Sequence, residues 1–188
     1  MDAFSYLSVL LSIIIGLAMT QVLQGYRALI LSRARVRFYW LPLLWSGLIL
    51  LLVVQHWWAS FGLAQRTEWS FADFLVTLVL TALIYMMAAI VLPDVPGDRP
   101  LDLQDHYWRE RRPLYGLFVA AVAWSVLREW QLERQLPERE NLLFHGLFIA
   151  VGVIGLLIRR ERVHQLLTLL MTGVFAAYVI LLFARLGQ

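Results

Sequence analysis

Residues 71–92 read FADFLVTLVLTALIYMMAAIVL and carry a single charged side chain, Asp73, near their start. The hydrocarbon core of a bilayer is about 30 Å thick, so a helix needs roughly 20 apolar residues to cross it. Five further segments of the same kind occupy most of the chain, at residues 4–31, 38–63, 113–132, 137–158 and 163–186. The sequence therefore predicts an all-α, polytopic transmembrane bundle of six helices, with residues 1–188 forming a single transmembrane domain.

The composition supports the same class and excludes several kinds of chemistry. Hydrophobic residues make up 61% of the chain, and there is no cysteine, which excludes disulfides and thiolate metal sites. All 16 basic residues are arginine, so Schiff-base chemistry on lysine is excluded too. The arginines flank the apolar segments, so we expect the bilayer and its anionic lipids as partners, and no nucleic acid.

The arginines divide unequally between the two sides of the predicted bundle. Eleven fall on one side: Arg27, Arg33, Arg35, Arg37, Arg99, Arg109, Arg111, Arg112, Arg159, Arg160 and Arg162. Five fall on the other: Arg66, Arg128, Arg134, Arg139 and Arg185. Cytoplasmic loops of membrane proteins carry an excess of basic residues. We therefore expect a multi-pass protein of the bacterial inner (cytoplasmic) membrane, with the eleven arginines in the cytoplasm and both termini outside.

The longest connection, residues 93–112, lies on the cytoplasmic side. Its prolines and Gly97 stop the third segment from continuing. Residues 101–112 then predict a short interfacial helix, and Pro113 would begin the fourth span, where a missing backbone donor does no harm. Six arginines on this side are expected to contact lipid phosphates: Arg109, Arg111, Arg112, Arg159, Arg160 and Arg162.

Small and polar residues recur at every fourth position of the first segment. They are Ser8, Ser12, Gly16, Thr20 and Gln24. Small residues let helices approach closely, and hydroxyls and amides hydrogen-bond across the contact. We interpret this stripe as the central packing face of the bundle, with Gly152 and Gly155 as partners, or as the seam of a homo-oligomer. The alternative is the polar lining of a pore, to which Gln21 and Thr172 would contribute.

No ionisable residue falls at mid-depth of a predicted span, which argues against a proton-coupled pump. Polar groups gather instead near the outer surface: His56, Asp73, Arg128, Glu129 and His145. We expect each to reach the interface separately, with the arginine snorkelling outward. The alternatives are a metal site of imidazole and carboxylate or a site for an anionic head group.

Other candidate chemistry is sparse. His56 and His145 raise the hypothesis of a bis-histidine haem, which requires the two imidazoles to face each other. Asp102, His106 and Glu110 share a helix face and give a second hypothesis of a metal site. The alternative is that they belong to a solvated face with salt bridges. Enzyme signatures are missing, and neither Ser46 nor Ser125 has an evident base in the sequence.

The stretches Gln55-His-Trp-Trp58 and Asp105-His-Tyr-Trp-Arg-Glu-Arg-Arg112 resemble those of small bacterial six-helix membrane proteins. The opening Phe4-Ser-Tyr-Leu-Ser8 and the closing Leu-Leu-Phe-Ala-Arg185 extend the resemblance to the whole chain. It implies a bacterial membrane bundle without an assigned activity, and it transfers no site residue.

These features favour a non-enzymatic membrane component that self-associates or binds a membrane partner. The first alternative is a small channel or facilitator for ions or small solutes, lined by the polar residues of the first and sixth segments. The second is a membrane protein that binds haem or a divalent metal through the histidines. Apart from the haem or divalent metal of this second alternative, no cofactor is expected.

Overall fold

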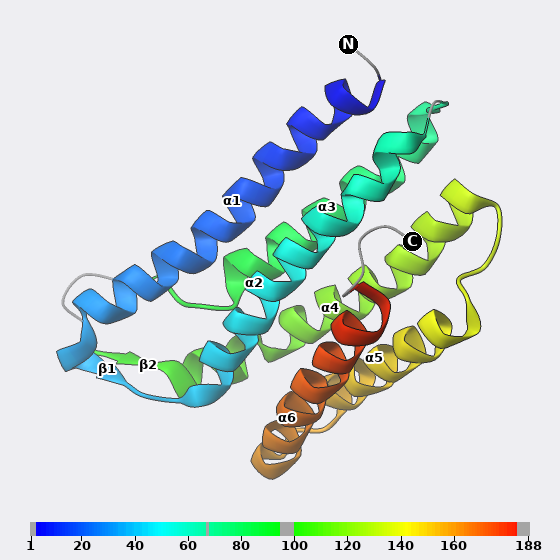
Figure 1. The fold of residues 1–188 in the computed structure, drawn as a ribbon. Helices are drawn as coiled ribbons and strands as arrows, with labels where there is room; N and C mark the ends of the chain where they lie inside the picture. The colour runs from blue at the N-terminus through cyan, green and yellow to red at the C-terminus, as the bar shows by residue number, and fades with distance from the viewer. Residues whose placement is uncertain (1–2, 67, 95–99, 184–188) are drawn as a thin grey trace.

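The computed structural model describes residues 3–66, 68–94 and 100–183. Within these ranges the chain folds into six α-helices (Figure 1): α1 (Ala3–Leu31), α2 (Trp40–Ser60), α3 (Phe71–Ile90), α4 (Leu103–Glu133), α5 (Arg139–Leu157) and α6 (Glu161–Tyr178). The remaining elements are short: η1 (Arg33–Arg35), β1 (Val36–Arg37), η2 (Phe61–Gln65), β2 (Leu101–Asp102) and η3 (Val179–Phe183). The all-α bundle predicted from the sequence is confirmed.

Five helices in the described part of the chain are long and apolar enough to cross a membrane: α1, α2, α3, α5 and α6. The protein therefore has the makeup of a multi-pass membrane protein. Helix α4 differs because its first three turns carry several charges and its apolar part ends at Arg128 and Glu129.

Helix α4 lies at the centre of the bundle, packed between α3 and α5, while α1 covers α3, and α6 packs against α5 and α2 (Figure 1). On one side, the indole N–H of Trp124 donates to the carbonyl of Val76 on α3 at 2.8 Å. On the other side, the ring of Tyr115 lies where a Cβ on Gly155 would be. The absence of a side chain there lets α5 approach α4 closely.

The structure corrects the prediction for residues 101–133, because the expected interfacial helix and fourth span form one continuous helix. The carboxylate of Asp102 begins α4 by accepting from the backbone N–H groups of Gln104 and Asp105 at 2.8 and 3.2 Å. Pro113 removes one backbone N–H but lies inside the helix without ending it.

At the same end of the molecule, the connections before α2 and α4 are joined. Strands β1 and β2 pair in parallel, with Val36 opposite Leu101. Arg37 also pairs with Asp102 at 3.0 Å. Burial raises the pKa of the Asp102 carboxyl, but the two backbone N–H groups and Arg37 outweigh it and hold that pKa below its usual value.

Arg111 and His164 tie α4, α5 and α6 together at this end. The guanidinium of Arg111 donates to the carbonyls of Gly155, Leu156 and Ile158 at 2.8, 3.2 and 2.9 Å, where α5 ends and its last carbonyls lack helical partners. His164 on α6 bonds the Ile158 carbonyl through Nε2 at 2.8 Å. Its Nδ1 therefore accepts from the Tyr107 hydroxyl on α4 at 2.7 Å.

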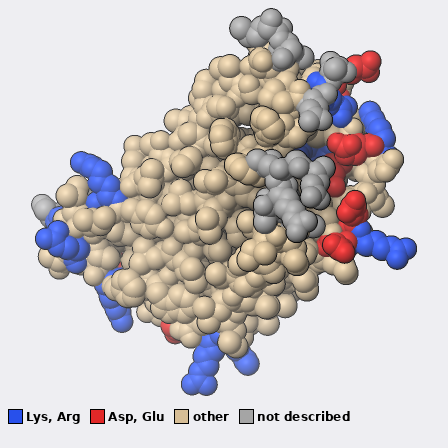
Figure 2. Space-filling view, viewed as in Figure 1, with Lys and Arg blue, Asp and Glu red and all other residues tan. Residues whose placement is uncertain are grey.

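Charge is distributed unequally between the two ends. In Figure 2, the charged side chains at the end formed by the α1–α2 and α5–α6 connections are almost all blue, whereas the red acidic side chains gather at the opposite end together with some blue ones. This agrees with the split of arginines expected from the sequence, of which Arg99 and Arg185 lie outside the described residues.

We predict that Arg111→Ala lowers the stability of the purified protein by about 3 kcal/mol, because three carbonyls at the end of α5 lose a charged donor. Thermal unfolding in detergent, followed by circular dichroism, measures the change. The matched control is Arg112→Ala, since Arg112 is the next residue and is exposed. Equal melting temperatures for the two variants would contradict the capping role.

Candidate functional site

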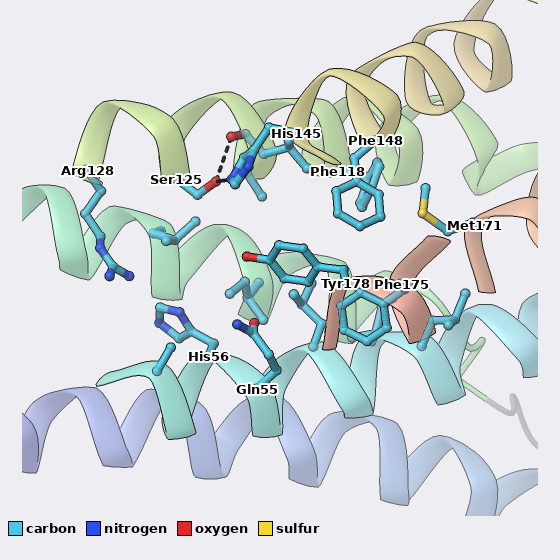
Figure 3. Close-up of a pocket in the computed structure, with 18 of the residues that line it drawn as sticks. Gln55, His56, Phe118, Ser125, Arg128, His145, Phe148, Met171, Phe175 and Tyr178 are labelled. Carbon is cyan, nitrogen blue, oxygen red and sulfur yellow. Dashed lines mark hydrogen bonds between the residues drawn. The ribbon is translucent and has the colours of Figure 1, made fainter. Parts of the chain in front are cut away.

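A cavity of about 160 Å³ lies between α2 and the α5–α6 pair, with α3 and α4 behind it (Figure 3). One end is apolar and is lined by Trp45, Ile49, Phe118, Phe148, Met171 and Phe175. The other end is polar and is lined by Gln55, Ser125, Arg128, Glu129, Asn141 and His145.

One face of α4 runs the length of the cavity. Phe118, Ala121, Ser125 and Arg128 follow one another at spacings of three and four residues, which places them in one row on the helix. At 1.5 Å per residue, the row extends over about 15 Å. The lining therefore changes along this row from an aromatic ring through a hydroxyl to a guanidinium.

Aromatic contacts hold the apolar end open. Trp45 on α2 meets the rings of Tyr115 and Phe118 edge-on, at centroid distances of 5.1 and 5.6 Å. Phe148 on α5 contacts Phe118 at 6.3 Å and Phe175 on α6 at 6.4 Å. Such tilted pairs are favourable in themselves and fix the ring orientations. The apolar end is therefore a preformed pocket.

At the junction of the two ends, Ser125 on α4 meets His145 on α5. The Ser125 Oγ lies 2.9 Å from His145 Nε2 (Figure 3). The Nδ1 of His145 lies 2.7 Å from the carbonyl of Asn141, one turn earlier on α5. Because a carbonyl only accepts, Nδ1 carries the proton and Nε2 is the acceptor that faces the serine.

The sequence shows no evident base for Ser125, whereas the structure places the His145 imidazole beside its hydroxyl. Ser125 and His145 each stand ten residues from Gln135, in the connection between α4 and α5. Residues placed symmetrically about the turn of an antiparallel helix pair lie at the same height, so this symmetry is the signal that could have revealed the contact.

Arg128 is the least satisfied group of the cavity. Its Nε is buried and has no hydrogen-bond partner in the part of the chain that the structure describes. The same holds for the side-chain oxygen of Asn141, whose amide nitrogen donates to Glu129 at 3.1 Å. An unpaired buried donor costs about 1–3 kcal/mol, and more when it is charged, so such a group calls for an explanation.

Four of the five polar residues expected near the outer surface line this one cavity: His56, Arg128, Glu129 and His145. The expectation that each reaches the interface separately is therefore wrong for the two histidines, which are 4% and 7% exposed. His56 Nε2 donates at 2.9 Å to Thr81, whose hydroxyl is itself committed to the Thr77 carbonyl. The His56 ring is thus held against α3.

Asp73, the fifth of these residues, belongs to a separate structural cluster. Its carboxylate accepts from the backbone N–H of Ser70 at 3.1 Å and from the Gln131 amide at 3.0 Å. Arg66 adds an ion pair at 3.4 Å and donates to the Leu132 carbonyl at the end of α4. These contacts cap α3 and fasten it to α4.

The acidic and histidine residues of the start of α4 do not converge. Asp102 caps the helix, His106 Nε2 bonds the Ile90 carbonyl at 3.2 Å, and Glu110 pairs with Arg109 at 3.1 Å. Burial lowers the pKa of His106 despite the nearby Glu110 carboxylate. Among the described residues, no group of three or more histidines and carboxylates could hold a metal ion.

Most of the stripe on α1 is exposed, and its first two members, Ser8 and Ser12, line a second pocket beside α2. Ser12, Gly16, Thr20 and Gln24 are exposed, whereas Leu11, Ile15, Ala18 and Val22 form the buried face. The reading as a central packing face is therefore wrong, and Gly152 and Gly155 serve the contact between α5 and α4 instead. An oligomer seam on this outer face stays a prediction.

The remaining members of the predicted sets are scattered. Ser8 bonds the Ser5 carbonyl within α1, Gln21 reaches the Tyr85 hydroxyl at 3.5 Å, and Thr172 bonds the Thr168 carbonyl. Of the six arginines expected at lipid phosphates, Arg109, Arg112, Arg159, Arg160 and Arg162 are exposed. Arg111 is buried and caps α5, so the structure removes it from that group.

We predict that Arg128→Met raises the stability of the protein by about 1 kcal/mol, because a methionine fills similar space without an unpaired buried donor. The matched variant is Arg66→Met, which loses two hydrogen bonds and an ion pair and should lower stability. Thermal unfolding of both variants tests this. A loss at Arg128→Met as large as that at Arg66→Met would show that Arg128 has a structural role.

No protein-family model matches the chain, and no curated protein or solved structure is significantly similar to it.

Proposed function

We propose that this membrane protein binds an amphipathic ligand, with an apolar chain and an anionic head, in the cavity beside α4. The observation that carries the proposal is the buried Nε of Arg128, which has no hydrogen-bond partner among the described residues and lies at one end of a cavity whose other end is aromatic. Ligand sites are typically apolar with a few placed polar groups, as this cavity is.

The charged groups of the cavity favour an anionic head. Glu129 is the main opposite charge that acts on Arg128, but its carboxylate accepts from the Asn141 amide at 3.1 and 3.4 Å, and within the described residues the Arg128 Nε has no hydrogen-bond partner. Arginine presents a planar set of donors that matches carboxylate and phosphate oxygens. In a site largely shielded from water, this pairing is stronger than on an exposed surface.

The apolar end limits what chain the ligand can have. A cavity of about 160 Å³ takes a short acyl chain or the first carbons of a longer one. The ring edges of Phe118, Phe148 and Phe175 offer dispersion contacts to such a chain. This fits a lipid or a lipid fragment, the kind of molecule that a membrane supplies at high local concentration.

We further propose that the protein resides in the bacterial inner membrane with its arginine-rich end in the cytoplasm. The support is the charge split along the sequence, since basic residues are retained on the cytoplasmic side. Self-association through the exposed face of α1, and passive flux of ions or small solutes as the alternative function, stand beside the ligand-binding proposal as broader expectations.

We expect purified protein to bind octanoate and octyl phosphate, and to bind octanol at least tenfold more weakly, because Arg128 recognises the charge. Arg128→Gln should lower the affinity for both anions at least tenfold, which corresponds to about 1.4 kcal/mol. Titration calorimetry in lipid nanodiscs measures these affinities. Arg139→Gln, which removes an exposed arginine outside the cavity, is the control. Equal affinities of Arg128→Gln and the control would refute the proposed site.

Because the chain has no cysteine, single substitutions can test its orientation. Ala34→Cys lies in the exposed connection after α1, and Leu136→Cys in the exposed connection between α4 and α5. A maleimide that does not cross membranes should label Leu136→Cys in intact cells and Ala34→Cys only after permeabilisation. The reverse pattern would invert the orientation.

A further inference from the structure

We propose that Ser125 and His145 are a nucleophile and general base that cleave acyl esters in this cavity. The inference rests on the proposed function, since the same apolar end holds the acyl chain. It goes beyond binding by assigning a reaction to this pair of side chains.

The geometry of the pair is that of an activated nucleophile. Serine attacks a carbonyl only when a base takes its proton, and the base needs a third group to fix its orientation. His145 Nε2 lies 2.9 Å from the Ser125 hydroxyl, within reach for proton transfer. The Asn141 carbonyl, 2.7 Å from Nδ1, fixes the tautomer that leaves Nε2 free to accept.

The serine hydroxyl has a second acceptor, which is the Val122 carbonyl one turn earlier at 2.7 Å. Serines inside helices commonly make such local bonds, as Ser46 does to the Leu43 carbonyl at 2.8 Å. This contact satisfies Ser125 without any imidazole. Because the hydroxyl has one proton, Val122 and His145 are alternative acceptors, and Ser125 donates to the imidazole when it gives up the bond to Val122. Ser46 offers a matched control.

Ser125 also lies where an ester carbonyl would be. In an acyl ester the carbonyl separates the chain from the head, and Ser125 separates the aromatic end of the cavity from Arg128 (Figure 3). The guanidinium stands three residues further along the same helix face. In this inference it holds an anionic head and stabilises the negative charge that develops on the carbonyl oxygen.

The reaction balances with water as the only co-reactant. In the first step, Ser125 Oγ bonds to the acyl carbon and its proton moves to His145 Nε2. The ester C–O bond breaks, and the leaving alcohol takes that proton. In the second step, a water molecule gives a proton to Nε2 and its oxygen bonds to the acyl carbon. The bond to Oγ then breaks, Ser125 recovers the proton, and a fatty acid is released.

The test uses the full-length protein in nanodiscs, with p-nitrophenyl octanoate as substrate and a decyl fluorophosphonate as covalent probe. Wild-type protein should be labelled once, at Ser125, and should hydrolyse the ester. Ser125→Ala should abolish labelling and lower the rate at least about 100-fold, and His145→Gln should lower the rate by about 10²–10⁴-fold. Ser46→Ala should be labelled and active like the wild type.

Octanoate binding, measured on the same samples, separates the two proposals. If wild type and Ser125→Ala both bind octanoate but the probe labels neither, the hydrolase inference is overturned and the binding site stands. Labelling of Ser125→Ala at the wild-type level also overturns the inference. If Ser125 is labelled while octanoate does not bind, the proposed binding function fails and the reactive serine stands.

Discussion

The close approach of α5 to α4 is the constraint on which the rest of the bundle depends. Gly152 and Gly155 leave room for the side chains of α4, where a Cβ would meet Phe118, Val119 and the Tyr115 ring. At this separation, α4 lies at the centre of the bundle and contacts both α3 and α5. The same approach lets Arg111 reach the end of α5 at one end of the molecule, and it brings His145 to Ser125 near the other.

The buried polar groups of the bundle fall into two kinds. Asp73 and Arg111 are surrounded by partners, with each interaction serving a helix end. Arg128 is different because its Nε lies buried beside a cavity without a partner among the described residues. The missing partner costs free energy, since an unpaired polar group is costly where water does not reach it. Among the described residues, Arg128 is therefore a buried charged group whose Nε lacks a partner and which lines the cavity.

The sequence predicts the class and most helix positions because apolar length is a local property that the bilayer dictates. It fails where the outcome depends on contacts between helices. The stripe on α1 has a regular spacing, but spacing alone does not say which face of a helix turns inward. In the structure the buried face of α1 is the one that carries Leu11 and Val22. Pro113 predicts a helix start, but the Asp102 cap begins the helix earlier. The pairing of Ser125 with His145 joins two helices, so the signal for it is their symmetric placement about the α4–α5 connection and not a pattern around either residue.

The parallel pairing of β1 with β2 links the connection before α2 to the connection before α4. Together with the Arg37–Asp102 ion pair and the Arg111 contacts, it anchors the helices to one another at the arginine-rich end. The cavity lies toward the opposite end, where the described residues of α2 and α5 share few contacts. We therefore expect the proposed ligand to enter between α2 and the α5–α6 pair, because a separation of these helices would leave the connections at the arginine-rich end in place.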